Sequence, residues 1–339
     1  MRITLGRVAG VLALLAGFLA CSVFAGLVVG PSTLAPGSVL DVLVGNDVDG
    51  PAADIVLRIR LPRVVLAVLV GAALSVSGVL FQALLRNPLA DPYVLGVSGG
   101  AALGGIAMLS VGSAVGLGYE AVPPAAFAGS VATTLLLFGV AGVRGRVSAT
   151  HLLLTGVVFN AFASAAIVFL ASTAGLTESA SIFLWLIGNL SATRIDIAGW
   201  VAAFLLLGLL CAAPMARGLN LLTLGEESAQ QLGVEVERHK RLLLVATSLM
   251  VGAAVSAAGL IGFVGLIIPH LLRVVFGPDH RLLIPAAVLG GAAFLVVCDT
   301  VARTLLDGRE LPVGAITALV GGPLFLWLLR RHHVRSFAP

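Results

Sequence analysis

Residues 62–84 read PRVVLAVLVGAALSVSGVLFQAL, an apolar segment in which Arg63 is the only charged residue. A helix of about 20 apolar residues spans the roughly 30 Å hydrocarbon core of a bilayer. Small residues such as Gly71 and Gly78 are typical of transmembrane helices, where they let neighbouring backbones approach closely. The segment therefore predicts a membrane-spanning helix.

Apolar segments of this kind recur along the chain and predict about ten transmembrane helices. The eighth segment is short and carries Pro269, His270 and Arg273, so nine helices are the alternative count. The expected fold is an all-α polytopic membrane protein with a single domain over residues 1–339. The expected helices lie near residues 8–30, 62–84, 93–111, 121–142, 151–171, 195–214, 242–262, 264–276, 282–299 and 312–330.

The composition makes a soluble enzyme the weakest of the broad classes of protein. Hydrophobic residues make up 59% of the chain and charged residues 11%, whereas soluble globular proteins carry roughly 25% charged residues. The net charge of +4 does not predict nucleic-acid binding, because the basic residues are scattered between apolar runs and act as topology signals. Cys21, Cys211 and Cys298 lie far apart without metal-ligand spacing, so no metal is expected on this chain.

The distribution of basic residues predicts the topology. The run at 8–30 is too long for a signal-peptide core and predicts an uncleaved first helix, with a faint lipoprotein-like site ending at Cys21 as the alternative. With the N-terminus inside, most Lys and Arg residues lie on the cytoplasmic side, as the positive-inside rule requires. An even number of helices then places both termini in the cytoplasm of a bacterial inner membrane.

Polar segments between the helices predict three further features. Residues 31–53 are rich in Gly, Pro, Asp and Asn and predict an external loop. Residues 182–187 are apolar but too short to span, and predict a half-helix at the outer mouth of a cavity. Residues 215–241 predict a cytoplasmic loop of two short surface helices, with Gly233 as a helix stop, that docks a soluble partner.

Arginines at the expected outer surface predict a docking site. Arg60 and Arg63 flank Pro62, which suits the first turn of a helix, and Arg303 lies at the outer end of the ninth span. Guanidinium groups that point outward together would receive carboxylates of another protein. The alternative is that these arginines snorkel to lipid headgroups. Under the docking interpretation, Arg60→Glu with Arg63→Glu abolishes docking and leaves the protein folded.

The turn Arg86-Asn87-Pro88-Leu89-Ala90-Asp91-Pro92 follows the second span. It predicts either an ordinary helix hairpin or an inner gate into which Asn87 and Leu89 project. No nucleotide-binding or catalytic motif occurs in the sequence, so the chain itself is not expected to be an enzyme, and energy must come from a partner or an ion gradient.

These segments resemble the iron-siderophore, haem and vitamin B12 permeases of type II ABC importers, known as the FecCD-type family. The matching residues cover about 57 to 330 and occur in the order expected for the family. They include Arg60 to Arg63, Gly71 to Leu74, Arg86 to Pro92, Leu95 to Ala101, Leu224 to Glu226, Phe263 to His270, Asp279 to Arg281 and Glu310 to Gly314.

The resemblance implies a ten-helix subunit that pairs with a second copy and sits on two cytoplasmic ATPase subunits, which bind ATP and Mg²⁺. It implies that Arg60, Arg63 and Arg303 meet acidic residues of a periplasmic or surface substrate-binding protein. The implied inner gate comprises Asn87, Leu89 and Thr150, although Ala149 replaces a hydroxyl that some members carry. The implied ATPase-coupling residues are Gly225, Glu226, Ala229, Leu232 and Gly233, with Ala229 and Gly233 as small residues that let the ATPase approach.

The expected function is import of a metal chelate by alternating access in a homodimer. Iron-siderophore is the first expectation for the chelate, with cobalamin or haem as alternatives. Ala161, Ser164 and Ala165 share one face of the fifth span and are expected to line the passage. Rival hypotheses are an ion-coupled secondary transporter, for which Asp196 and Asp299 are the acidic residues within the expected spans, and a non-transport helical scaffold.

Overall fold

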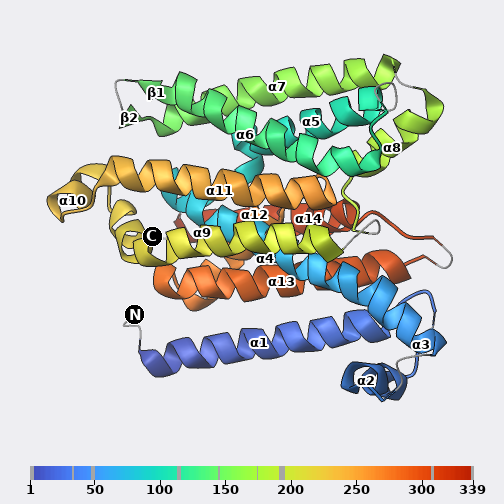
Figure 1. Cartoon of the computed structure of the whole chain (residues 1–339). Helices are drawn as coiled ribbons and strands as arrows, with labels where there is room; N and C mark the ends of the chain where they lie inside the picture. The colour runs from blue at the N-terminus through green and yellow to red at the C-terminus, as the bar shows by residue number, and fades with distance from the viewer. Residues whose placement is uncertain are drawn as a thin grey trace.

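The computed structural model describes residues 4–32, 34–46, 50–112, 116–143, 146–173, 175–190, 195–306 and 309–336. Its long helices lie side by side along one common direction (Figure 1). In chain order, the first half comprises α1 (Leu5–Val28), α2 (Pro36–Val44), α3 (Pro51–Ala53), the π-helical turn η1 (Asp54–Arg60), α4 (Leu61–Leu84), η2 (Pro92–Leu95), α5 (Val97–Val111), η4 (Tyr119–Ala121) and α6 (Val122–Ala141).

Two-residue strands β1 (Gly142–Val143) and β2 (Arg146–Val147) pair antiparallel after α6. The second half comprises α7 (Ala149–Thr173), α8 (Leu176–Leu186), α9 (Ile195–Leu222), α10 (Glu226–Gln231), α11 (Val236–Ala258), α12 (Val264–Phe276), α13 (His280–Thr304) and α14 (Val313–Ser336). One end of the bundle carries α10 together with β1 and β2, and the opposite end carries α2, α3 and α8 (Figure 1). We call them the α10 end and the α8 end.

The helix count agrees with the expected all-α polytopic membrane fold. Within the described residues, 7 helices are long and apolar enough to cross a membrane, and the shorter apolar helices are Val97–Val111, Val264–Phe276 and Val313–Trp327. Together they correspond to the ten predicted segments. The eighth segment is α12, which has 13 residues and is buried along most of its length.

Helix α4 forms the centre of the bundle and contacts α9, α11, α12 and α13. Its residues are buried from Gly71 to Leu84 without interruption. Two close approaches explain this position. A Cβ atom added at Gly71 would meet the backbone of Gly291 in α13, and one added at Gly78 would meet the backbone of Gly265 in α12. Glycine is therefore required for α4 to touch both neighbours.

Two expected loops are more helical than the sequence indicated. Residues 31–53 contain α2, which starts at Pro36, buries Val39 and Val42, and ends at Gly45 with a left-handed φ of 86°. Proline favours the first turn of a helix and glycine the position after its last turn. In this segment the residues that indicated a loop therefore mark the two ends of a short helix. Residues 215–241 contain the single short helix α10, because α9 continues to Leu222 and α11 already begins at Val236. The prediction of two short helices in this loop is wrong.

Candidate functional sites

A buried ionic cluster lies at the α8 end, where α4 begins and α13 ends. The Asp299 carboxylate is 1% exposed and lies between two arginines. Its Oδ1 is 3.0 Å from Nε of Arg63, and its Oδ2 is 3.1 Å from Nε of Arg303. Arg63 also places Nη1 2.7 Å from Oε2 of Glu310, in the segment before α14. The cluster therefore joins α4, α13 and the α13–α14 connection.

Arg60 closes the end of α1. Its Nη1 donates to the carbonyl oxygens of Leu27 at 2.6 Å and Val28 at 2.7 Å, and its Nη2 donates to Ser32. Arg303 reaches the same helix through a hydrogen bond from Nη2 to the Gly26 carbonyl at 3.0 Å. The last carbonyls of a helix lack partners within the helix and carry partial negative charge, so they attract cations.

The expectation that Arg60 and Arg63 point outward together is wrong for this structure. Arg60, Arg63 and Arg303 are only 2%, 6% and 4% exposed. The α1 carbonyls and the Asp299 carboxylate draw the guanidinium groups inward, because a buried guanidinium needs such partners. Sequence analysis did not identify these internal acceptors, although the i,i+4 spacing of Asp299 and Arg303 in one helix was visible. Whether the three arginines serve docking stays a prediction.

At the α10 end, the expected coupling residues surround one short helix. Gly225 precedes α10 with a φ of 117°, and Gly233 follows it with a φ of 85°. Both values favour glycine. Leu232 and Leu224 are 60% and 66% exposed, whereas Ala229 is fully buried against the helix bundle. The interpretation of Ala229 as a small residue facing a partner is therefore wrong, because the apolar side of α10 turns toward the bundle.

Glu226, the first residue of α10, makes two ion pairs. Its Oε2 lies 2.5 Å from Nζ of Lys240 in α11, and its Oε1 lies 3.5 Å from Nη2 of Arg86 in the turn after α4. Lys240 is buried and also pairs with Glu237 at 3.3 Å. Sequence analysis did not predict these partners. Arg86 is far from Glu226 along the chain, and Lys240, although it lies in the next helix, is 14 residues away.

The expected gate residues lie on neighbouring elements at this end. Asn87 and Leu89 are exposed in the turn after α4, where the Asn87 Oδ1 accepts a hydrogen bond from the Leu89 backbone N–H at 2.9 Å. Thr150 is exposed in the first turn of α7. The turn after α4 leads into η2, which packs against α7. The contact between η2 and α7 therefore connects the turn that carries Asn87 and Leu89 with the helix that carries Thr150.

Polar contacts fix η2 in place. Asp91 begins it by accepting a hydrogen bond from the Tyr93 backbone N–H at 2.9 Å, and burial raises the pKa of Asp91 to about 6. Asn160 of α7 donates from Nδ2 to the Tyr93 carbonyl at 2.8 Å. The Tyr93 hydroxyl donates to the carbonyl of Ile261 at 2.8 Å and accepts from the N–H of the same residue at 2.7 Å. This tyrosine thus fastens the turn to the connection between α11 and α12.

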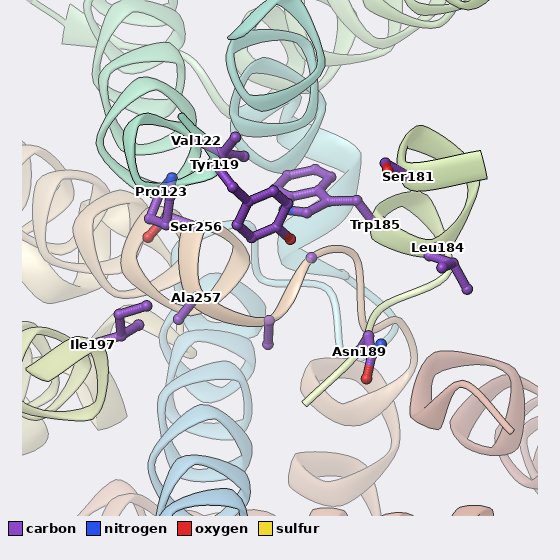
Figure 2. A pocket seen from close by; sticks show the side chains of 12 residues that line it. Tyr119, Val122, Pro123, Ser181, Leu184, Trp185, Asn189, Ile197, Ser256 and Ala257 are labelled. Carbon is purple, nitrogen blue, oxygen red and sulfur yellow. The ribbon is translucent and has the colours of Figure 1, made fainter. Parts of the chain in front are cut away.

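A cavity of about 200 Å³ lies at the α8 end, and none of the predicted docking, gate or coupling residues lines it. Figure 2 shows Tyr119 and Trp185 among the residues that line it, with Ser256, Ala257 and Asn189 around the same space. The cavity leaves room beside α8, the helix expected to form the outer mouth. Leu184 and Trp185, which belong to the segment 182–187 expected at the outer mouth of a cavity, are among its lining residues.

Comparison with known proteins identifies the family of this fold. The model of the FecCD transport family matches residues 18–331, which include the Asp299 cluster, the ion pairs of Glu226 and the turn after α4. The chain belongs to the FecCD transport family. Relatives of this FecCD chain include the cobalamin import system permease protein BtuC of Halobacterium salinarum, 46% identical over 83% of this chain and 75% of the relative. The hemin transport system permease protein HmuU of Yersinia pestis is 44% identical over 83% of this chain and 84% of its own.

The architecture of the FecCD chain also has a counterpart among solved structures. An inward-facing metal-chelate-type ABC transporter matches it with a TM-score of 0.82 and 30% identity, over 95% of this chain and 99% of the other. The FecCD chain is accordingly a multi-pass permease subunit of an ABC importer, as the resemblance predicted.

Proposed function

We propose that two copies of this chain form the membrane passage of an importer whose α10 end faces the cytoplasm. Both termini of the chain then lie inside, and two ATPase subunits bind at α10. The observation that carries the proposal is the projection of α10 with Leu224 and Leu232 exposed on either side of it. Exposed leucines beside charged side chains are suited to contact with a soluble protein. The sequence has no phosphate-binding loop of its own, which supports a separate ATPase.

The cargo that we propose is a metal chelate of the tetrapyrrole class. Relatives with 46% and 44% identity carry the names of a cobalamin and a hemin permease. Iron-siderophore, the first expectation from sequence analysis, becomes the alternative cargo. The passage would run between the α7 helices of the two copies, where Ala161, Ser164 and Ala165 are all exposed in the isolated chain.

For the α8 end we propose a substrate-binding protein as the partner. Arg60, Arg63 and Arg303 would support its docking surface from beneath, by holding the end of α1 and the segment that carries Glu310. Arg309, which is exposed in that segment, is then the residue available for a carboxylate of the binding protein. Arg309→Glu is expected to weaken docking without loss of folding. Unchanged affinity of the binding protein for this variant would reject this docking surface.

The structure disfavours the ion-coupled alternative at one position. Asp299, a candidate ion ligand within a span, is already held by Arg63 and Arg303. The deciding experiment reconstitutes the permease with its ATPase and binding protein in vesicles, and measures uptake of cyanocobalamin, haemin and a ferric hydroxamate. We expect ATP-dependent uptake of one tetrapyrrole. Uptake driven by a proton or sodium gradient without the ATPase would overturn the proposal. Uptake of the ferric hydroxamate alone would replace the tetrapyrrole with an iron-siderophore as the cargo.

A further inference from the structure

Glu226 joins three elements at the α10 end. The side chain belongs to α10, and its two carboxylate oxygens contact different partners: Lys240 of α11 at 2.5 Å and Arg86 of the turn after α4 at 3.5 Å. The Lys240 side chain is 6% exposed and fixes one oxygen to the bundle. The other oxygen is left for Arg86, whose side chain is 44% exposed. Through this carboxylate α10 is linked to the turn of the predicted gate.

Arg86 occupies a backbone position that favours glycine. Its φ is 50°, one of two positive values among non-glycine residues in the described part of the chain. The Asn87 N–H bonds to the Gln82 carbonyl at 3.1 Å, which makes Arg86 the left-handed residue that ends α4. Residues with a Cβ atom are disfavoured there, and glycine is the usual occupant. The arginine side chain is therefore a candidate for a role that offsets this backbone cost.

The turn that starts at Arg86 continues into the gate elements. Asn87 and Leu89 follow directly, Asp91 then begins η2, and Asn160 of α7 holds the Tyr93 carbonyl. A displacement of Arg86 would therefore reach α7 through one short, hydrogen-bonded segment. No flexible linker intervenes between Arg86 and η2, because Pro88 and Pro92 stiffen the turn.

The space beside this ion pair is open. A hollow of about 610 Å³ is lined by Arg86, by Glu226 and Glu227, and by other residues of the α10 segment. A protein surface that settles on α10 would cover the hollow and enclose the pair. Enclosure strengthens the attraction between the charges, because the effective dielectric constant falls when water is excluded.

We propose that the Arg86–Glu226 ion pair transmits movement of α10 to the gate turn, with Arg86 as a positioning residue for Asn87 and Leu89. The inference rests on the proposed function, since it requires an ATPase bound at α10. It goes beyond the expected coupling set, because it names the contact by which α10 reaches the gate. Arg86 does not touch the cargo in this proposal.

The test follows gate exposure directly. Cys21, Cys211 and Cys298 are replaced by alanine, Leu89→Cys is added, and the permease is assembled with its ATPase in nanodiscs. Labelling of the cysteine at position 89 by N-ethylmaleimide is measured without nucleotide and with ATP and vanadate. In this parent protein we expect nucleotide to change the labelling rate. Arg86→Gly should reduce that change by about two- to fivefold, the range expected for a partly exposed ion pair. Arg86→Lys should retain most of it.

Stability separates this role from a structural one. Glycine suits a φ of 50°, so Arg86→Gly should melt at the same temperature as the parent or higher. Arg86→Asn, which also tolerates this backbone conformation, should behave like the glycine variant. A full nucleotide response in both variants would overturn the inference while leaving the proposed function intact. A parent that binds no ATPase, or shows no nucleotide response, would reject both.

Discussion

Asp299 shows how a single carboxylate can hold two arginines away from water inside the membrane region. It contacts Arg63 and Arg303 at 3.0 and 3.1 Å, and all three side chains are almost fully buried. Removing one member of a buried ion pair leaves an uncompensated charge and typically costs about 3 to 5 kcal/mol. This arrangement changes the expected result of reversing Arg60 and Arg63. The double variant should fail to fold, so it cannot report on docking alone.

Asp299→Asn is expected to lower the thermal stability of the detergent-solubilised permease markedly, because Arg63 and Arg303 would then face each other without a carboxylate between them. The matched control is Arg58→Gln. Arg58 pairs with Asp54 at 3.0 Å, but the two side chains are 82% and 65% exposed, so its loss should change stability by less than about 1 kcal/mol. Equal melting temperatures for the two variants would show that burial does not distinguish these pairs.

Asp91 provides a pH-dependent prediction. Its pKa is raised from 3.8 to about 6 by burial, so the ionised form at neutral pH is held at a cost to folding. That cost is absent below the unfolded pKa, grows as the pH rises from there to about 6, and is constant at higher pH. Asp91→Asn keeps an acceptor for the Tyr93 N–H and removes the charge. The variant should melt above the wild type at pH 7.5 and together with it near pH 4. A constant difference across this range would contradict the prediction.

At the scale of elements, α4 depends on glycines as well as on large buried side chains such as Leu74 and Phe81. A Cβ atom at Gly78 would be 2.8 Å from Cα of Gly265 and closer still to its carbonyl, which backbone atoms cannot relieve by a rotamer change. Gly78→Leu should therefore separate α4 from α12 and destabilise the protein by about 1 to 3 kcal/mol or more. Gly10→Ala in α1 is the control, because nothing lies within 4 Å of a Cβ atom there. Thermal melting monitored by size-exclusion chromatography compares the two, and a similar loss in both would reject the packing argument.

The helices themselves could be predicted because apolar length is a local property of the sequence. Residues 62–84 correspond closely to α4, and the short α12 was recognised from 264–276. The direction of the arginine side chains could not be predicted, because it depends on contacts distant in sequence: Arg60 with the end of α1, and Arg63 with Asp299. The buried side of α10 was missed for the same reason, since Ala229 is covered by the bundle core.

At the scale of the whole molecule, α7 is the helix along which we propose contact with a second copy. Only 22% of its most apolar window is buried in the single chain, but the share is the same in α1, so exposure alone does not select α7. Small residues on one of its faces, including Ala165, allow close approach of an equivalent helix. In the cysteine-free background, Ala165→Cys is therefore expected to give a disulfide-linked dimer in membranes after mild oxidation.

The control for this crosslink is Leu14→Cys in α1, a position that is 64% exposed at the opposite side of the bundle from α7 (Figure 1). It should remain monomeric on a non-reducing gel, because lipid rather than protein is expected around α1. Efficient dimerisation through position 14, with none through position 165, would show that the two copies meet along α1 and would reject contact along α7.

The shortness of α12 also has a consequence for biogenesis. Its 13 residues correspond to about 20 Å of helix, well below the roughly 30 Å of a bilayer core. Such a segment is a weak insertion signal, and unsatisfied backbone groups at its ends are costly in lipid. Since α12 packs against both α4 and α13, the nascent chain is expected to hold it at the translocation machinery until α13 has been synthesised. The two helices would then insert together as a hairpin, so that α13 already shields α12 from lipid when α12 packs against α4.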